Sequence, residues 1–197
     1  MKKLIAAFLA LCMMMTACAA LATGFQNDWS VLPDDDETGE TSVMMDYTAT
    51  VEQYADALAT KADGYMDDEY AATLPDSVRM ALDAAEVGFV LKDLDGDGHA
   101  ELIVMAKDPD NAFLNNMVLT VLTHDGTEGH VVLESAERSR YYYAGDNLFA
   151  YEGSNGADDS TVTTYALENG QLTDLHTETP DTAYQSMETE SLMPTQE

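Results

Sequence analysis

The sequence predicts an α+β fold in which N-terminal helices pack on an antiparallel β-meander. Two observations support this prediction. Apolar residues recur at helical spacing between residues 51 and 85, whereas short apolar runs separated by turn residues fill the chain from residue 87 to 175. Because consecutive hairpins build antiparallel sheets, helices that precede them along the chain are expected to cover such a sheet.

The N-terminus has the form of a bacterial secretory signal over residues 1–17. Two lysines precede an apolar stretch, and the sequence Met-Thr-Ala-Cys that ends at Cys18 resembles the lipobox of bacterial lipoproteins. That resemblance implies that Cys18 carries a lipid and anchors the protein to the outside of the cell membrane. Two alternatives remain open: cleavage after Ala22, which would release a secreted protein, and an uncleaved apolar anchor over residues 4–22.

Composition divides the rest of the chain into three parts. Residues 18–42 are acidic and poor in core residues, which is typical of a flexible linker. Residues 43–176 are long enough to form a single globular domain. Residues 177–197 are rich in Thr, Glu and Pro, and this composition predicts a disordered tail.

The chain is strongly acidic and nearly free of cysteine. Its formal charge of −29 becomes −31 when two lysines leave with the signal. Such a charge repels nucleic acid, so no nucleic-acid partner is expected. The two cysteines are Cys12, inside the signal, and Cys18, so the globular part has no thiol for catalysis or for a disulfide.

Two helices are expected before the first strand. Thr50 opens a capping-box pattern with Gln53, which predicts that the first helix begins there. The apolar face of this helix consists of Val51, Tyr54, Ala55, Leu58, Ala62 and Tyr65. A second, shorter helix follows Pro75, with Val78, Met80, Ala81, Leu82 and Ala85 as its apolar side.

Four hairpins are expected after the helices. The paired segments are residues 87–92 with 102–107, 117–123 with 131–134, 141–144 with 148–152, and 161–167 with 171–175. The last pair flanks Asn169 and Gly170, and Asn-Gly is the strongest short-range signal for a hairpin turn.

The turn of the first hairpin is a candidate calcium site. Its expected ligands are Asp93, Asp95, Asp97, the backbone carbonyl of His99, and Glu101. Calcium takes about 6–8 oxygen ligands, so this segment offers most of a coordination shell. An EF-hand would require Glu at loop position 12 and a following helix, but Val104 in an apolar run stands there. The alternative interpretation is a solvated acidic turn.

Residues 87–107 resemble the D-x-D-x-D-G-x-x-[DE] calcium hairpin of FG-GAP and VCBS-type repeats and of integrin-like propeller blades. They are also similar to the single-copy segments of small bacterial surface lipoproteins. The resemblance implies one bound Ca²⁺ and a propeller-blade-like form of the meander. The chain carries one copy of the pattern.

One tyrosine cluster has the chemistry of a recognition surface. Its members are Tyr141, Tyr142, Tyr143 and Tyr151. Strand alternation places Tyr142 on the face opposite Tyr141 and Tyr143, so at least one ring is expected to face outward if the sheet is covered on one side. Exposed tyrosines stack on sugars or anchor protein partners, whereas the alternative is cross-strand packing without a ligand.

No catalytic residue can be named from the sequence. It contains no G-x-S-x-G, P-loop or H-E-x-x-H motif, and His124, His130 and His176 lack metal-ligand spacing. We therefore expect a non-catalytic, calcium-binding surface module with a protein or glycan partner. The alternative is an extracytoplasmic, glycan-directed hydrolase in which calcium supports a site of strand-end carboxylates.

Overall fold

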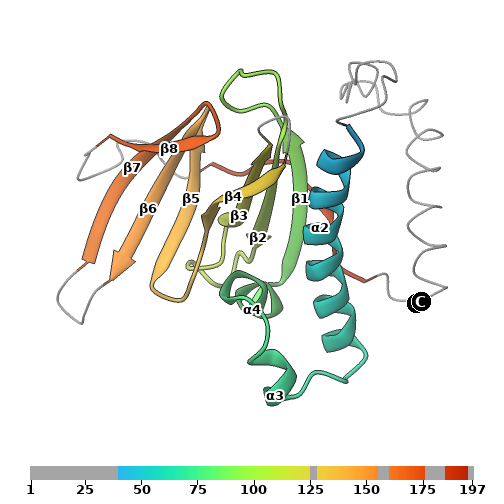
Figure 1. Ribbon diagram of the computed structural model, residues 1–197. Helices are drawn as coiled ribbons and strands as arrows, with labels where there is room; N and C mark the ends of the chain where they lie inside the picture. The colour runs from blue at the N-terminus through green and yellow to red at the C-terminus, as the bar shows by residue number, and fades with distance from the viewer. Residues whose placement is uncertain (1–39, 125–127, 155–159, 176–184, 195–197) are drawn as a thin grey trace. The chain divides into compact units, whose positions relative to one another are not determined.

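Antiparallel β-sheet dominates the structure, and few helices accompany it (Figure 1). This computed structural model describes residues 40–124, 128–154, 160–175 and 185–194, so the signal, Cys18 and His176 lie outside the described residues. The elements in chain order are α2 (Glu40–Ala62), α3 (Asp68–Ala71), α4 (Asp76–Asp83), β1 (Glu86–Lys92), β2 (Glu101–Lys107), β3 (Met117–His124), β4 (Gly129–Glu134), β5 (Ser139–Gly145), β6 (Leu148–Ser154), β7 (Ser160–Glu168), β8 (Gln171–Asp174) and β9 (Glu190–Ser191).

The first helix starts earlier than the sequence predicts. α2 begins at Glu40, inside the predicted linker of residues 18–42, and Thr50 lies in the middle of the helix. An N-cap residue must flank the helix, so the predicted capping box is wrong. The pattern arises by chance here, because Glu and Gln are also good residues for a helix interior.

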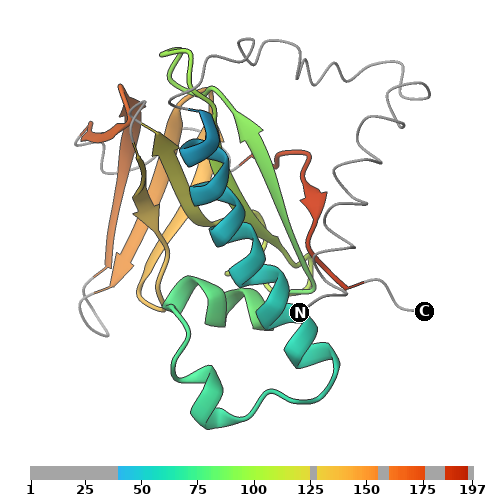
Figure 2. The ribbon, with the colours of Figure 1, turned by 45° about the vertical axis from the view of Figure 1, so that its right-hand side comes forward.

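One face of α2 and one face of α4 pack on the sheet, and Figure 2 shows α2 crossing in front of the strands. The buried residues of these two faces are Tyr47, Val51, Tyr54, Ala57 and Leu58 in α2, and Val78, Ala81 and Leu82 in α4. They share one apolar core with strand residues such as Leu102 and Val104. Tyr65, predicted to continue the first face, lies beyond the end of α2 and is 78% exposed.

All four predicted hairpins are present. β1 pairs with β2, β3 with β4, β5 with β6, and β7 with β8, each antiparallel. The hairpins join one nine-stranded sheet whose main path runs β8-β7-β6-β5-β3-β2-β1-β9. The described strands therefore form one continuous sheet and do not divide into the four-stranded blades of a propeller.

β4 departs from a simple meander. β3 pairs with β4 over residues 120–124 and with β5 over residues 117–118, while β2 occupies its other edge. The register of β3 shifts once against β2 and once against β4. Such bulges bend a strand and increase its twist, which lets β4 and β5 leave the same edge of β3 in different directions.

The sheet also curls, so that strands far apart in its order meet. The Gly170 N–H, in the β7–β8 turn, donates a hydrogen bond to Asp95 Oδ2, in the β1–β2 loop, over 2.8 Å. β7 and β2 are four steps apart in the sheet, which would separate them by about 19 Å if the sheet were flat. The curled face holds a second apolar core, formed by Ile103, Met105, Val118, Val121, Leu133, Tyr143, Phe149, Leu167 and Met187.

Part of the predicted disordered tail belongs to this fold. β9 pairs with β1 at Gly88 and Phe89, and the Leu192 N–H donates to the Val87 carbonyl over 2.8 Å. Met187 is only 8% exposed and packs in the second core. The structure thus corrects the prediction for residues 185–194, because a two-residue strand and one buried methionine are too short a pattern for periodicity to reveal.

Candidate metal centre

The loop between β1 and β2 turns sharply at two glycines. Lys92 and Glu101 are directly opposite each other and close the hairpin at the base of the loop. Gly96 has a φ of 77° and Gly98 a φ of 94°, values in the left-handed region. A side chain would be strained at either position, so the turn requires glycine at both.

Backbone N–H groups of the loop are directed at its own aspartates. Asp93 accepts from the Gly96 N–H over 2.8 Å and from the Gly98 N–H over 3.2 Å. Asp95 Oδ1 accepts from the Asp97 N–H over 3.2 Å. These bonds fix the aspartate side chains over the turn, so that their orientation is set by the backbone.

Three of the predicted ligands converge. Asp93, Asp95 and Glu101 each offer a carboxylate oxygen, and these oxygens lie within 4.8 Å of one another. Asp97 is not part of this group, and its Oδ1 accepts from the N–H of His99 over 2.7 Å. The loop therefore presents a three-carboxylate cluster (Asp93, Asp95, Glu101) of the oxygen type that hard divalent cations prefer.

Glu101 is the buried member of the three-carboxylate cluster. Its side chain has no exposed area, and its oxygens accept hydrogen bonds from the Leu94 N–H over 2.8 Å and from the Thr123 hydroxyl over 3.2 Å. Burial raises the pKa of Glu101 to about 7; the Leu94 and Thr123 donors oppose the increase, and the charges of Asp95 and Asp97 add to it. A nearby positive charge would stabilise the ionised carboxylate.

Lys92 does not direct its amine at this cluster, although it faces Glu101 in the strand register. Its Nζ lies 5.6 Å from the centre of the Tyr143 ring and donates to the Tyr143 hydroxyl over 3.4 Å. The ammonium group is thus held by an aromatic ring through a cation–π contact. The Lys92 ammonium therefore does not pair with a carboxylate of the cluster.

Three residues outside the loop support it, and sequence reasoning did not identify them. Thr123 bonds Glu101, Gly170 bonds Asp95, and the Tyr47 hydroxyl donates to the Ala100 carbonyl over 2.9 Å. No short-range pattern could reveal these contacts, because they span 22, 75 and 53 residues of sequence respectively.

The tyrosine cluster packs within the sheet. Tyr142 lies in the first core and Tyr143 in the second, as strand alternation predicts, and both are at most 5% exposed. The expectation of an outward-facing ring among the three consecutive tyrosines fails for Tyr142 and Tyr143, because apolar cores cover both faces of the sheet. The half-buried rings of Tyr141 and Tyr151 lie 5.0 Å apart, and Tyr165, which the sequence reasoning missed, lies within 6.2 Å of both.

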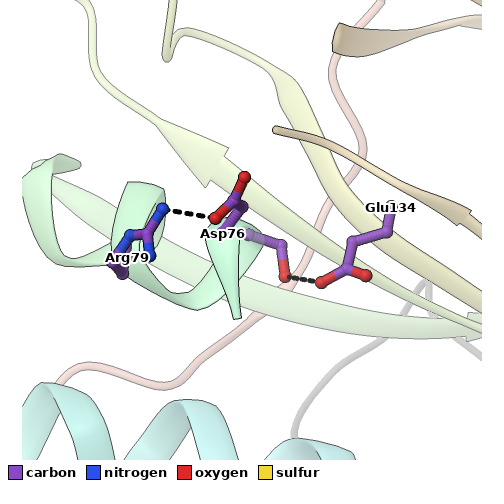
Figure 3. Close-up of polar contacts among 4 residues, drawn as sticks. Asp76, Arg79 and Glu134 are labelled. Carbon is purple, nitrogen blue, oxygen red and sulfur yellow. Dashed lines mark hydrogen bonds and ion pairs between the residues drawn. The ribbon is translucent and has the colours of Figure 1, made fainter. Parts of the chain in front are cut away.

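A second polar cluster joins α4 to β4 (Figure 3). The Ser77 hydroxyl donates to Glu134 Oε1 over 2.6 Å, and Arg79 forms an ion pair with Asp76 beside it. Burial raises the pKa of the neighbouring Tyr54 hydroxyl above its usual range. Because Ser77 is only 2% exposed, its hydroxyl is not accessible to a substrate, and the cluster acts as a link between two elements.

The histidines add no ligand to the three-carboxylate cluster in the part of the chain that the structure describes. His124 is buried at the end of β3, and His99 and His130 are exposed.

No helix among the described residues has both the length and the apolar character needed to span a membrane. Comparisons with protein-family models, curated proteins and solved structures give no match to this chain.

Proposed function

We propose that this protein is a calcium-binding, non-catalytic module of the bacterial cell surface, held at the membrane by a lipid on Cys18. The observation that carries the proposal is the convergence of Asp93, Asp95 and Glu101, whose ligand oxygens lie within 4.8 Å of one another. Three carboxylates at this distance repel one another strongly, and a divalent cation between them removes that repulsion.

The donor set favours calcium over other cations. All three groups are carboxylates, and the part of the chain that the structure describes adds neither thiolate nor imidazole to them. Asp97 and the His99 carbonyl follow in the same loop and would raise the number of oxygen ligands toward the six to eight of calcium. Magnesium demands near-ideal octahedral geometry, which a one-segment loop with two left-handed glycines suits less well.

The resemblance of residues 87–107 to FG-GAP and VCBS-type calcium hairpins agrees with this assignment. The loop of this chain connects two antiparallel strands, as a calcium hairpin does. β1 and β2 pair without a register shift, from Glu86 opposite Lys107 to Lys92 opposite Glu101. A single site on a rigid hairpin is suited to stabilising structure. We propose that the bound calcium is structural.

The N-terminal sequence supports location outside the cytoplasm. The proposed lipid on Cys18 and the acidic linker that follows would hold the folded domain near the membrane while its net charge keeps it soluble. We also propose that the domain binds a protein or glycan partner. The half-buried rings of Tyr141, Tyr151 and Tyr165 are the part of the tyrosine cluster that could contact it.

One observation favours a second function, an extracytoplasmic hydrolase that acts on glycans. Burial raises the pKa of Glu101 to about 7, and its carboxyl lies close to that of Asp95; two neighbouring carboxyls, one of them with a raised pKa, are the arrangement found in glycosidases. Against this, Glu101 has no exposed area, and two protein donors already occupy its oxygens. The non-catalytic function is therefore the better supported one.

Thermal melting with and without divalent cations tests the proposal. At millimolar calcium, a site with a Kd near 10⁻⁴–10⁻³ M stabilises the folded state by about 0.4–1.4 kcal/mol. The melting temperature of the full chain should rise with calcium, fall with a chelator, and respond less to magnesium. Identical melting in all three conditions would contradict calcium binding, and reproducible turnover of a glycan substrate would favour the hydrolase.

A further inference from the structure

We infer that Gly170, in the β7–β8 turn, positions Asp95 for the cation, and that cation binding in turn holds the β7–β8 hairpin against the β1–β2 loop. This inference rests on the proposed calcium binding and adds a consequence to it: the bound cation and the docked β7–β8 turn stabilise each other.

The first step is the hydrogen bond between the two turns. The Gly170 N–H donates to Asp95 Oδ2 over 2.8 Å, whereas Asp95 Oδ1 accepts from the Asp97 N–H over 3.2 Å. Both oxygens are thus oriented by backbone donors. A carboxylate oxygen can accept more than one contact, so Asp95 can bind a cation while it keeps the bond from Gly170. Such outer partners orient ligands and raise metal affinity.

The second step is the role of glycine at position 170. Its φ is 69°, and a Cβ added there would lie 3.1 Å from the Thr123 methyl carbon and 3.3 Å from the Thr123 hydroxyl. Thr123 itself donates to Glu101. The β7–β8 turn therefore contacts the three-carboxylate cluster at Asp95, and a side chain at position 170 would also press on Thr123, the donor to Glu101.

The third step is thermodynamic reciprocity. If docking of the β7–β8 turn increases the affinity of the site for calcium, calcium must favour docking of that turn by the same factor. β7 pairs along its length with β6, but β8 lies at one end of the strand order and pairs only with β7 among the described strands, so β8 and the turn before it are held by fewer strand contacts than β7 is. We therefore expect docking of the β7–β8 turn on the β1–β2 loop, and not the β6–β7 pairing, to depend on the cation.

A pair of glycine substitutions in the full chain tests this inference. Gly170→Ala should weaken calcium binding about tenfold or more in a calorimetric titration, because the added methyl group strains the turn and displaces Asp95. Gly64→Ala is the matched control: Gly64 has a similar φ of 74°, but a Cβ added there would have no atom within 4 Å. The control should bind calcium as the wild type does.

Hydrogen exchange of the wild type gives a readout that does not depend on any substitution. Calcium should slow exchange of the Gly170 amide severalfold and leave the Gly64 amide, which donates to the Lys61 carbonyl at the end of α2, unchanged. If the wild type binds calcium but Gly170→Ala binds equally well and exchange at Gly170 does not change, the inference is wrong and the proposed function stands. If the wild type binds no calcium, the proposed function itself fails.

Discussion

The hydroxyl of Thr123, at the end of β3, donates a hydrogen bond to Oε1 of Glu101, at the start of β2, over 3.2 Å, and both side chains are buried. In a purely apolar core, the Thr123 hydroxyl and the Glu101 carboxyl would both lack hydrogen-bond partners. The pair therefore shows how the fold prepares a buried carboxylate at the start of an internal strand, with donors already directed at it.

Replacement of Thr123 by valine should destabilise the protein, because it leaves one oxygen of a buried carboxylate without its donor. A cost of about 1–3 kcal/mol is expected for such an unsatisfied group. Urea unfolding of Thr123→Val measures it. The control is Thr161→Val, the same substitution at an exposed position of β7, which should change the free energy of unfolding by no more than about 0.5 kcal/mol. If both variants lose the same stability, the hydrogen bond from Thr123 to Glu101 does not contribute to it.

Stability should fall at alkaline pH. Burial raises the pKa of both Tyr141 and Tyr142 from 10 to about 12. A raised pKa in the folded state means that the neutral hydroxyls contribute full stability below about pH 10, and that this contribution is lost as the pH rises toward 12. Denaturant unfolding from pH 8 to 12 checks this dependence.

Tyr142→Phe tests whether the Tyr142 hydroxyl causes part of the loss of stability at alkaline pH. The Tyr142 hydroxyl donates to the Phe113 carbonyl over 3.0 Å, so the variant loses a hydrogen bond at neutral pH but should show a shallower decline above pH 10. Tyr65→Phe, at a residue 78% exposed, should leave the profile unchanged. A decline in Tyr142→Phe as steep as that of the wild type would argue against this assignment.

Substitution of two methionines in the C-terminal segment tests whether this segment contributes to the stability of the fold. Met187 is 8% exposed and packs in the second core, whereas Met193 is 37% exposed. Met187→Ala should cost about 2 kcal/mol or more, as expected for a cavity in a core. Met193→Ala should have little effect. Chemical unfolding of both variants gives the comparison, and equal stabilities would mean that the tail does not contribute to the fold.

The lipid anchor is tested by the fate of Cys18. The full chain expressed in a bacterium that processes lipoproteins should enter the detergent phase on phase separation, and Cys18→Ser should move to the aqueous phase. The intact mass of the mature protein gives the cleavage site. A mature N-terminus at Thr23 in the aqueous phase would support the secreted alternative.

The sequence predicts the four hairpins well because their signals are local. Asn169 and Gly170 have φ values of 51° and 69°, the two positive values that an Asn-Gly hairpin turn requires. The carboxylates of the β1–β2 loop are equally local, and three of them do converge. The sequence does not fix the start of α2 at Glu40, because the capping pattern at Thr50 is also compatible with a helix interior.

The curl of the sheet could not be predicted from the sequence. It depends on register shifts in β3 and on a contact between Asp95 and Gly170, which are 75 residues apart. These features result from tertiary packing, and no spacing pattern encodes them. The same packing covers both faces of β5, which is why Tyr142 and Tyr143 are buried instead of exposed.

The central claim is that the three-carboxylate cluster binds calcium, and calorimetric titration of the full chain with Asp95→Asn tests it most directly. Asparagine keeps the size of the side chain and an oxygen that can accept from Gly170, but it removes one negative charge from the cluster. Asp63→Asn makes the same change of charge at an exposed residue after α2. We predict a Kd of about 10⁻⁴–10⁻³ M for the wild type and for Asp63→Asn, and no measurable binding for Asp95→Asn. Equal binding by all three proteins, or none by the wild type, would contradict the claim.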